Sequence, residues 1–412
     1  MPVISSPLRH PLPVPGFRVG SASCGVKSPE LKGKRQDVTL IVADVPTQAA
    51  AVFTQNSFRA ACVDLGEKTI RENSTNIRAI VANAGNANAG VGEMERVWSE
   101  QLVDLAAEAA GVDSSTVLSA STGVIGTPFP IDRIAATMHE SIDSLAEDNW
   151  LAAAEAIRTT DTFAKYTSRQ FDSFEQNMTG KTYTITGVSK GSGMIHPNMA
   201  TMLGFIATDA PISAERLQSM LSKIADRSFN SISVDGDTST NDTVYLLSSG
   251  LGLGDVELED TSAFEEALTE VAIELAQLIV RDGEGVTKFV SIEVSGAETE
   301  KQARELGRKI AVSPLVKTAF AGSDANWGRI ICAIGNSGAP INPAKVTIKA
   351  DDVLILQDGN LDPDYRDEMG MKVFAQQEFT LSVDIGLGQG HATVWTGDLT
   401  HEYITINAEY RS

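Results

Sequence analysis

Cysteine is scarce in this sequence, and its three occurrences are widely separated. Cys24, Cys62 and Cys332 form no CxxC pair and no even-numbered set, which excludes the disulfide framework of a small secreted domain. Long apolar runs are missing as well, since no stretch approaches the roughly 18 residues of a membrane-spanning helix. The proline-interrupted N-terminus has no apolar signal-peptide core. We therefore expect a cytoplasmic protein.

Positive charge is also in short supply. The chain carries 33 Lys and Arg against 54 Asp and Glu, a formal net charge of −21 at pH 7. Binding to phosphate backbones or anionic membranes depends on clustered basic side chains, so we expect neither nucleic acid nor a membrane as partner. Hydrophobic residues make up 42% and charged residues 21%, a globular balance in a chain long enough for two sub-domains or one large body.

The usual cofactor and metal signatures are missing too. The glycine-rich stretches at Gly250 and Gly386 lack the GxGxxG spacing that places a pyrophosphate at a helix start, and the GKT sequence at 180–182 has Glu175 where a phosphate loop needs glycine. The five histidines form no HExxH motif and no His/Cys cluster. No GxSxG elbow nominates a catalytic serine. We expect no cofactor and no metal.

Apolar periodicity predicts a mixed α/β fold. Residues three or four apart predict helices from Met94 to Gly111, from Ser213 through Ile224, and from Phe264 to Gly283. Short apolar or β-branched runs predict strands at 38–45, 77–84, 202–209, 231–235 and 243–249.

The last third of the chain predicts strands almost alone. The runs at 346–356, 379–386, 391–399 and 403–408 follow one another, with little helical pattern after the short segment 305–312. We interpret the whole as layered sheets and helices with substantial antiparallel pairing, not as a repeating βαβ barrel. No internal repeat and no linker marks a domain boundary.

The stretch KGSGMIHPNMATMLGFIATDA (190–210) joins a Gly, Ser, Pro and Asn segment to an apolar run through Thr201. A threonine hydroxyl becomes a nucleophile when a base lies within reach, and an N-terminal threonine supplies its own α-amine, part of which is free base at neutral pH. To create that terminus the chain must cut itself before Thr201, by attack of the hydroxyl on the Ala200 carbonyl. The alternative is that Thr201 merely begins a strand.

Acyl transfer also needs hydrogen-bond donors for the developing oxyanion. The segment SASTGVIGTP (119–128) is dense in Gly, Ser and Thr. The backbone N–H of Gly123 and the hydroxyl of Thr122 are candidate donors. An ordinary glycine turn is the alternative interpretation of this segment.

With these residues in place, the sequence resembles the arginine-biosynthesis ornithine acetyltransferase family, also called glutamate N-acetyltransferases. The resemblance extends over almost the whole chain. It departs from the family pattern at Ala325, where relatives are expected to have proline, and at the terminal EYRS, where DYRT is more usual. Five segments carry the resemblance: KGSGMIHPNMATML (190–203), TTDTF (159–163), RDGEG (281–285), DANWGRI (324–330) and INAEYRS (406–412).

The resemblance implies self-cleavage between Ala200 and Thr201. An α chain of residues 1–200 and a β chain of residues 201–412 would stay together, most often as α2β2. Thr201 would take the acetyl group from N-acetylornithine and release ornithine, and glutamate would then leave as N-acetylglutamate, a ping-pong transfer without a cofactor. Acetyl-CoA could serve as a second acetyl donor. The implied fold is a four-layer-like α/β arrangement similar to the N-terminal nucleophile hydrolases but wound differently.

The resemblance also implies roles for individual residues. Thr122 and Gly123 would form the oxyanion hole. Carboxylates of the substrates suit Lys190 and their amines suit Glu284, through charge-assisted hydrogen bonds. Without the resemblance, Lys190 and Glu284 would be interpreted as surface charges and the C-terminal residues as an ordinary tail. One threonine of the TTDT run is expected to bind substrate, and we choose Thr162, with Thr160 as the alternative. The implied substrate-binding set is thus Thr162, Lys190, Thr201, Glu284, Asn407 and Ser412.

Two other functions stay open. A self-processing aminopeptidase or amidohydrolase of similar fold would let water resolve the acyl-enzyme, and would release free acetate without glutamate. A non-catalytic α/β binding protein would keep Thr201 as a plain strand residue and the chain uncut.

Overall fold

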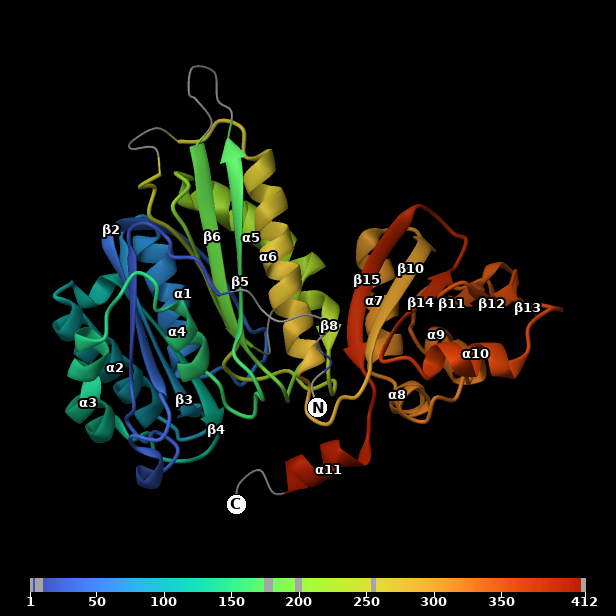
Figure 1. The fold of residues 1–412 in the computed structure, drawn as a ribbon, viewed down its shortest axis with the longest axis horizontal. Helices are drawn as coiled ribbons and strands as arrows, with labels where there is room; N and C mark the ends of the chain where they lie inside the picture. The colour runs from blue at the N-terminus through green and yellow to red at the C-terminus, as the bar shows by residue number, and fades with distance from the viewer. Residues whose placement is uncertain (1–2, 4–9, 174–180, 197–201, 253–256, 409–412) are drawn as a thin grey trace.

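The computed structural model describes residues 3, 10–173, 181–196, 202–252 and 257–408. Two sheets, each backed by helices, form two bodies that lie side by side (Figure 1). The first body is built largely from residues before 289, and the second body largely from residues 289–397. Both sheets mix parallel and antiparallel pairs. The predicted mixed α/β class with layered sheets and helices is confirmed.

The first sheet is organised around one long strand, β2, which continues well beyond the predicted 38–45. It pairs with β1 and β3 at its start and with β9 over Gln48–Phe53. Pro46 lies where the β2–β3 register shifts, a place where its missing N–H is tolerated. In spatial order the strands are β4 (Val117–Val124), β3 (Ile77–Asn86), β2 (Val38–Phe53), β9 (Thr243–Ser248), β7 (Leu203–Thr208), β6 (Lys181–Lys190) and β5 (Lys165–Ser173), with β1 (Phe17–Ala22) on β2.

Strands from both sides of position 200 are interleaved in this sheet. β7 and β9 lie between β2 and β6. β6 and β7 are antiparallel, with Lys190 opposite Leu203, and β7 and β9 are parallel, with Leu203 opposite Thr243. The predicted division into residues 1–200 and 201–412 therefore runs through the middle of a hydrogen-bonded sheet and not between the two bodies.

Helices cover the first sheet. The α2 helix (Met94–Ala110) and α3 (Ile131–Asp143) pack at β1 to β4, and α5 (Ala214–Arg227) and α6 (Ser262–Arg281) pack at β2, β5 and β6. The α4 helix (Trp150–Ala156) packs on β1 and β2, and α1 (Ala61–Asn73) on β4. The helices predicted near 94–111, 213–224 and 264–283 are thus confirmed as α2, α5 and α6.

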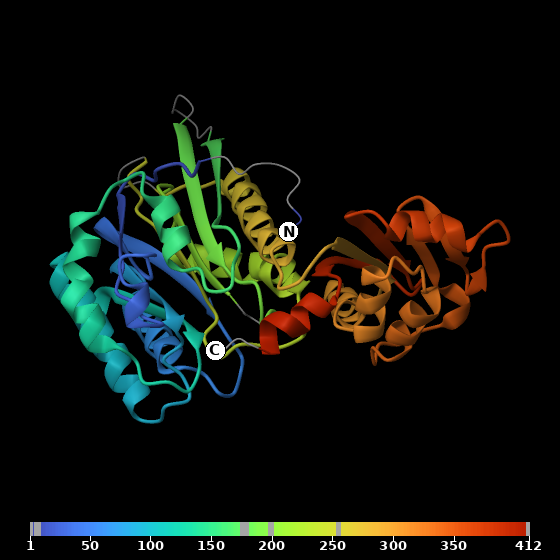
Figure 2. The same cartoon turned by 60° about the horizontal axis from the view of Figure 1, so that its bottom comes forward.

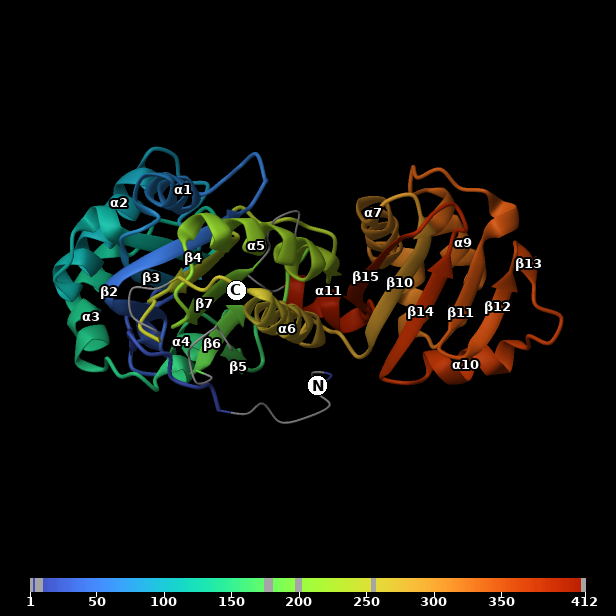
Figure 3. The same cartoon turned by 90° about the horizontal axis from the view of Figure 1, so that it is seen from above.

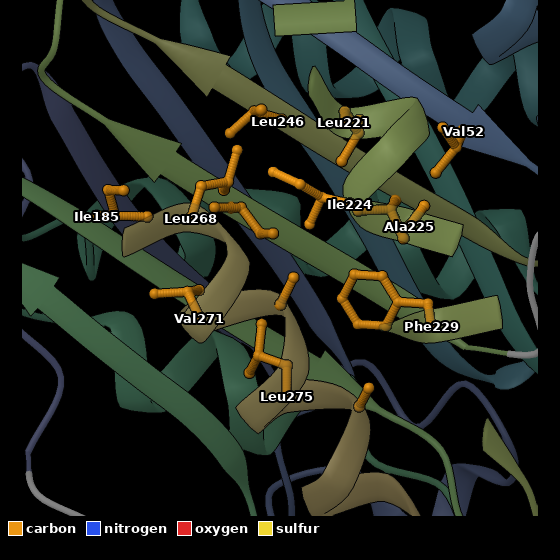
Figure 4. Packing of buried hydrophobic residues seen from close by; sticks show 14 of the residues in the cluster. Val52, Ile185, Leu221, Ile224, Ala225, Phe229, Leu246, Leu268, Val271 and Leu275 are labelled. Atoms are coloured by element: carbon orange, nitrogen blue, oxygen red, sulfur yellow. The ribbon is translucent and has the colours of Figure 1, made fainter. Parts of the chain in front are cut away.

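The largest core lies beneath α5 and α6. Figure 4 shows aliphatic side chains of both helices meeting those of the sheet. Each fully buried Leu or Ile of this kind contributes about 1.5–3 kcal/mol to folding, so this packing fixes α6 and the residues that follow it. The labelled side chains include Leu221 and Ile224 of α5, Leu268, Val271 and Leu275 of α6, and Ile185 and Leu246 of the sheet.

The second sheet has the order β13 (Asn360–Leu361), β12 (Val353–Gln357), β11 (Thr347–Ala350), β14 (Glu378–Asp384), β10 (Phe289–Ala297), β15 (Gly390–Gly397) and β8 (Ile232–Ser233). The α7 helix (Glu300–Ala311) packs on β10 and β15. The short strand β8, predicted as 231–235, comes from the sequence of the first body. Its parallel pairing with β15 links the two bodies.

The last third of the chain holds more helix than the sequence predicts. α8 (Pro314–Ala321), α9 (Trp327–Gly335) and α10 (Asp367–Phe374) have 8 or 9 residues each, too few for the apolar period to repeat clearly. The predicted strand at 403–408 is wrong, because these residues form α11 (His401–Ala408), a helix without a buried side chain. Figure 3 shows α11 between the two bodies. Single 3-10 turns occur at Pro29–Leu31, Ser114–Thr116, Phe229–Ser231 and Pro343–Lys345.

None of the helices in the described ranges combines the length and the apolar composition that crossing a bilayer requires.

Candidate active site

One pocket of the first body gathers most of the residues that the sequence analysis selects. It encloses about 950 Å³ of empty space, part of it open to solvent. Five predicted site residues from four separate segments of the chain line it: Thr122, Gly123, Lys190, Glu284 and Asn407. The fold thus brings together positions that lie far apart in the sequence.

The end of β4 forms one wall. Gly123 has φ +132°, and a Cβ added to it would lie 2.2 Å from the Gly85 carbonyl carbon, so only glycine fits here. The close approach occurs where the parallel β3–β4 ladder shifts register, at Gly85 and Asn86. Next to it, the Thr122 hydroxyl oxygen lies 3.2 Å from the Lys190 ammonium. The packing of β4 against β3 therefore requires glycine at position 123, and Thr122 beside it lines the pocket.

A cation and an anion face the same pocket. Lys190, at the end of β6, is 8% exposed, and Glu284, just after α6, is 7% exposed. Burial lowers the pKa of Lys190, and the nearby Asp161 carboxylate opposes that shift. The Asn407 amide of α11 donates to Glu284 Oε2 at 2.7 Å. Opposite charges with little water around them suit a ligand that carries both a carboxylate and an ammonium group.

The threonines of the TTDT run point to different places. Thr159 and Thr160 line the pocket. The Thr162 hydroxyl instead donates to Asp282, and its N–H donates to Asp282 Oδ2 at 2.9 Å. The structure therefore brings the alternative choice, Thr160, to the pocket and holds the preferred choice, Thr162, against a neighbouring carboxylate.

Three predicted residues, Ala200, Thr201 and Ser412, lie outside the described residues. Met202 follows Thr201 directly in the sequence, is buried and lines the pocket. Its carbonyl accepts the N–H of Thr243 at 3.0 Å, which fixes the start of β7 in the sheet. Met202, the described residue next in sequence to the predicted nucleophile, is thus part of the pocket wall.

Met194 and Ile195, upstream of the predicted cut, are held by hydrogen bonds to one carboxylate. Met194 lines the pocket and has φ +55°, which is uncommon for a residue with a side chain. Its N–H and that of Ile195 donate to the Asp235 carboxylate at 2.7 and 2.9 Å. The Tyr403 hydroxyl of α11 donates to the same carboxylate at 3.3 Å. Figure 2 shows α11 extending from the second body toward the first, where these contacts anchor it.

His196 ties the same segment to α7. Its Nε2 accepts from Arg308 Nη2 at 2.7 Å, which leaves the ring proton on Nδ1, 3.2 Å from the Ser233 hydroxyl. Burial, followed by the charge of Arg308, lowers the pKa of His196 to about 4. The ring is therefore neutral at pH 7 and has a structural role.

We predict an acid-sensitive contribution to stability from His196. Between the usual pKa of 6.5 and the folded value of about 4, the unfolded chain binds a proton that the folded ring does not. Stability therefore falls as the pH falls through this window. The melting temperature of His196→Asn should fall less than that of the unsubstituted protein between pH 7 and pH 4.5. His139→Asn, at an exposed position of α3, is the matched control. Equal slopes for all three proteins would contradict the prediction.

Some pocket residues are not selected by sequence reasoning. Asn241 lines the pocket, and its amide donates to the carbonyls of Ala87 and Ser121 at 2.6 and 3.0 Å, which fixes the end of β4. Ser239 and Asp242 line the pocket beside it. The available signal is the polar run GDTSTND (236–242) between two predicted strands, because a simple connection between strands does not require so many polar side chains.

Across the part of the chain that the structure describes, no group of three or more His, Cys, Asp and Glu side chains is arranged to hold a metal ion. The polar groups around the pocket are instead hydroxyl, amide, ammonium and carboxylate groups that suit an amino-acid ligand.

Comparison with known proteins decides the family. The model of the ArgJ family matches residues 18–412. The chain is 43% identical over 417 residues to the arginine biosynthesis bifunctional protein ArgJ of Pseudomonas fluorescens, and the match covers 100% of both chains. This chain belongs to the ArgJ family. The resemblance drawn from the sequence motifs is thereby confirmed.

Two solved structures are also similar to this chain. The arginine biosynthesis bifunctional protein ArgJ of Bacillus halodurans is 41% identical, with a TM-score of 0.49, over 50% of this chain and 99% of that one. The ornithine acetyltransferase of Mycobacterium tuberculosis, solved with ornithine, is 26% identical, with a TM-score of 0.37, over 46% of this chain and 94% of that one.

Proposed function

We propose that this protein is an acetyltransferase of arginine biosynthesis that moves the acetyl group from N-acetylornithine to glutamate through an acetyl-enzyme on Thr201. Membership of the ArgJ family supports the pathway. The observation that carries the proposal is the pocket beside Met202 in which the candidate oxyanion donors meet a cation and an anion.

The first step is self-cleavage. The Thr201 hydroxyl attacks the Ala200 carbonyl, the Thr201 nitrogen leaves, and water hydrolyses the resulting ester. The products are a carboxylate on Ala200 and a free α-amine on Thr201 that serves as the base in later turnovers. The uncommon backbone conformation of Met194 and the hydrogen bonds of Asp235 support this step, because they fix the chain at residues 194 and 195, a few positions before the scissile bond.

The second step is acetyl transfer. The Thr201 hydroxyl attacks the acetyl carbonyl, the α-amine takes the proton, and ornithine leaves with it. The amine of glutamate then attacks the acetyl ester, and N-acetylglutamate leaves. Because the Lys190 ammonium only donates, the Thr122 oxygen accepts from it, and the Thr122 proton stays available for the oxyanion alongside the Gly123 N–H.

Substrate binding follows from the charges. We propose that Lys190 holds the carboxylate that both substrates carry, and that Glu284, oriented by Asn407, holds the ornithine ammonium. We propose Thr160 instead of Thr162 as the substrate-binding threonine, because the Thr162 hydroxyl donates a hydrogen bond to Asp282. Ser412 keeps its proposed role at the C-terminus.

We further propose that the two cleaved chains stay together as α2β2 in the cytoplasm and that no cofactor is needed. The relatives' name includes the word bifunctional. We propose acetyl-CoA as the second acetyl donor.

Incubation of the purified protein with N-acetylornithine and glutamate tests the function. We expect ornithine and N-acetylglutamate in equal amounts, with the parallel double-reciprocal lines of a ping-pong reaction. Release of acetate without glutamate would favour the hydrolase. Absence of both reactions would contradict the proposal.

A further inference from the structure

A fully buried lysine lies just behind the pocket. Lys165, at the start of β5, places its ammonium 2.6 Å from Asp161 Oδ1 and 2.6 Å from Asp282 Oδ2, with side-chain exposures of 0, 0 and 1%. Lys165 does not line the pocket. Taking three charges out of water is unfavourable for stability unless their geometry is very good. The stability of the fold alone therefore does not explain why these three charged groups are buried together.

One arm of this cluster reaches Lys190. Asp161 Oδ1 also accepts the N–H of Gly191 at 2.8 Å, and Gly191 directly follows Lys190. The Asp161 carboxylate supports the positive charge of Lys190. Thr160, the neighbour of Asp161, lines the pocket. The position of Asp161 thus determines the position of the Lys190 ammonium in the pocket.

The other arm reaches Glu284. The Ser192 hydroxyl donates to the Asp282 carbonyl at 2.6 Å, and the Glu284 N–H donates to the Ser192 carbonyl at 2.9 Å. Gly193 completes the contact, since a Cβ there would lie 2.3 Å from Glu284 Oε2. Asp282, two residues before Glu284 in the chain, thus fixes the position of the Glu284 carboxylate through Ser192.

We propose that Lys165 is a positioning residue that sets the separation of Lys190 and Glu284 by holding Asp161 and Asp282 together. It thereby selects substrates whose carboxylate and ammonium groups match that separation. The inference rests on the proposed function and deepens it. It also gives a common purpose to the TTDTF and RDGEG motifs, which supply the two carboxylates.

Lys165→Met tests the proposal. Misplacing one charged hydrogen bond should raise the KM for N-acetylornithine and for glutamate about ten-fold. The fall in kcat should be smaller than this rise, because the nucleophile is untouched and only the contact from Lys190 to the Thr122 hydroxyl is loosened. Lys288→Met is the matched control. That lysine is also buried, and it donates to the Phe320 carbonyl and the Ser323 hydroxyl in the second body at 2.6 and 2.7 Å. Its loss should leave both KM values unchanged.

A second variant covers the case in which Lys165→Met does not fold. Asp161→Asn keeps the shape and an accepting oxygen but removes one charge, and it should show the same rise in KM. Unchanged KM values in a folded variant, or a fall in kcat alone, would overturn the proposal.

A crystal structure of the folded variant gives a readout that does not depend on activity. The Lys190 ammonium should move away from the Thr122 hydroxyl, 3.2 Å distant in the unsubstituted protein. An unchanged arrangement would overturn the positioning role. If the unsubstituted protein transferred no acetyl group, the proposed function would fail, while this structural comparison would still decide the role of Lys165.

Discussion

Thr201→Ala leaves the protein as one chain of 43.8 kDa and lowers acetyl transfer at least about a thousand-fold. Alanine has no hydroxyl to attack the Ala200 carbonyl and none to carry the acetyl group, so both steps stop together. The intact mass under denaturing conditions, the N-terminal residue of each fragment and the transfer assay measure the two effects.

Thr201→Ser is the matched control, because serine keeps the hydroxyl and, once cut, the α-amine. We expect this variant to cleave and to transfer acetyl groups, both more slowly. Cleavage of the alanine variant, or transfer by it, would refute the mechanism. Full activity of an uncut unsubstituted chain would show that the new terminus is not needed.

Gly123→Ala lowers kcat about 10²–10³-fold, the usual effect of losing one oxyanion donor. The new Cβ would meet the Gly85 carbonyl carbon at 2.2 Å and the Asn86 nitrogen at 2.4 Å, both of them backbone atoms. The end of β4 must therefore move, and it carries the Gly123 N–H and the Thr122 hydroxyl with it. Steady-state kinetics with both substrates measure the loss, which should fall on kcat more than on KM.

Gly111→Ala separates this effect from backbone strain. Gly111 ends α2 with φ +68°, and no atom lies within 4 Å of a Cβ added there. Alanine at this position should reduce stability by about 1 kcal/mol and leave kcat unchanged. An unchanged kcat in Gly123→Ala would remove Gly123 from the oxyanion hole.

The fold is predictable where a pattern repeats. α2 and α6 extend over 17 and 20 residues, so their apolar stripes recur over several turns. α11 is missed because Ile404, Thr405 and Ile406 are β-branched and favour a strand locally. Hydrogen bonds to residues distant in sequence hold this segment in place. The Thr400 hydroxyl donates to the Gly285 carbonyl, and the Tyr403 hydroxyl donates to the Asp235 carboxylate.

The pocket is predictable where a residue belongs to a recognisable motif, as Lys190 and Glu284 do. Asn241 is missed because its contacts join distant segments, and Lys165 is missed because one of its two carboxylate partners, Asp282, lies 117 residues away. Asn241, for example, donates to a carbonyl 120 residues away, and no local pattern records such a bond. The choice between Thr160 and Thr162 depends on how one loop turns, which residue type alone does not determine.

The interleaved strands of the first sheet determine the kinetic order of refolding for this protein. In the uncut chain, β6 and β7 belong to one polypeptide, and refolding is unimolecular. After the proposed cut between Ala200 and Thr201, β7 and β9 would belong to one fragment and would lie between β2 and β6 of the other. Two separate molecules must then find each other before the sheet can close. Recovery from denaturation consequently becomes a second-order process that depends on protein concentration, so the dilution that slows aggregation also slows the reassembly of the two fragments.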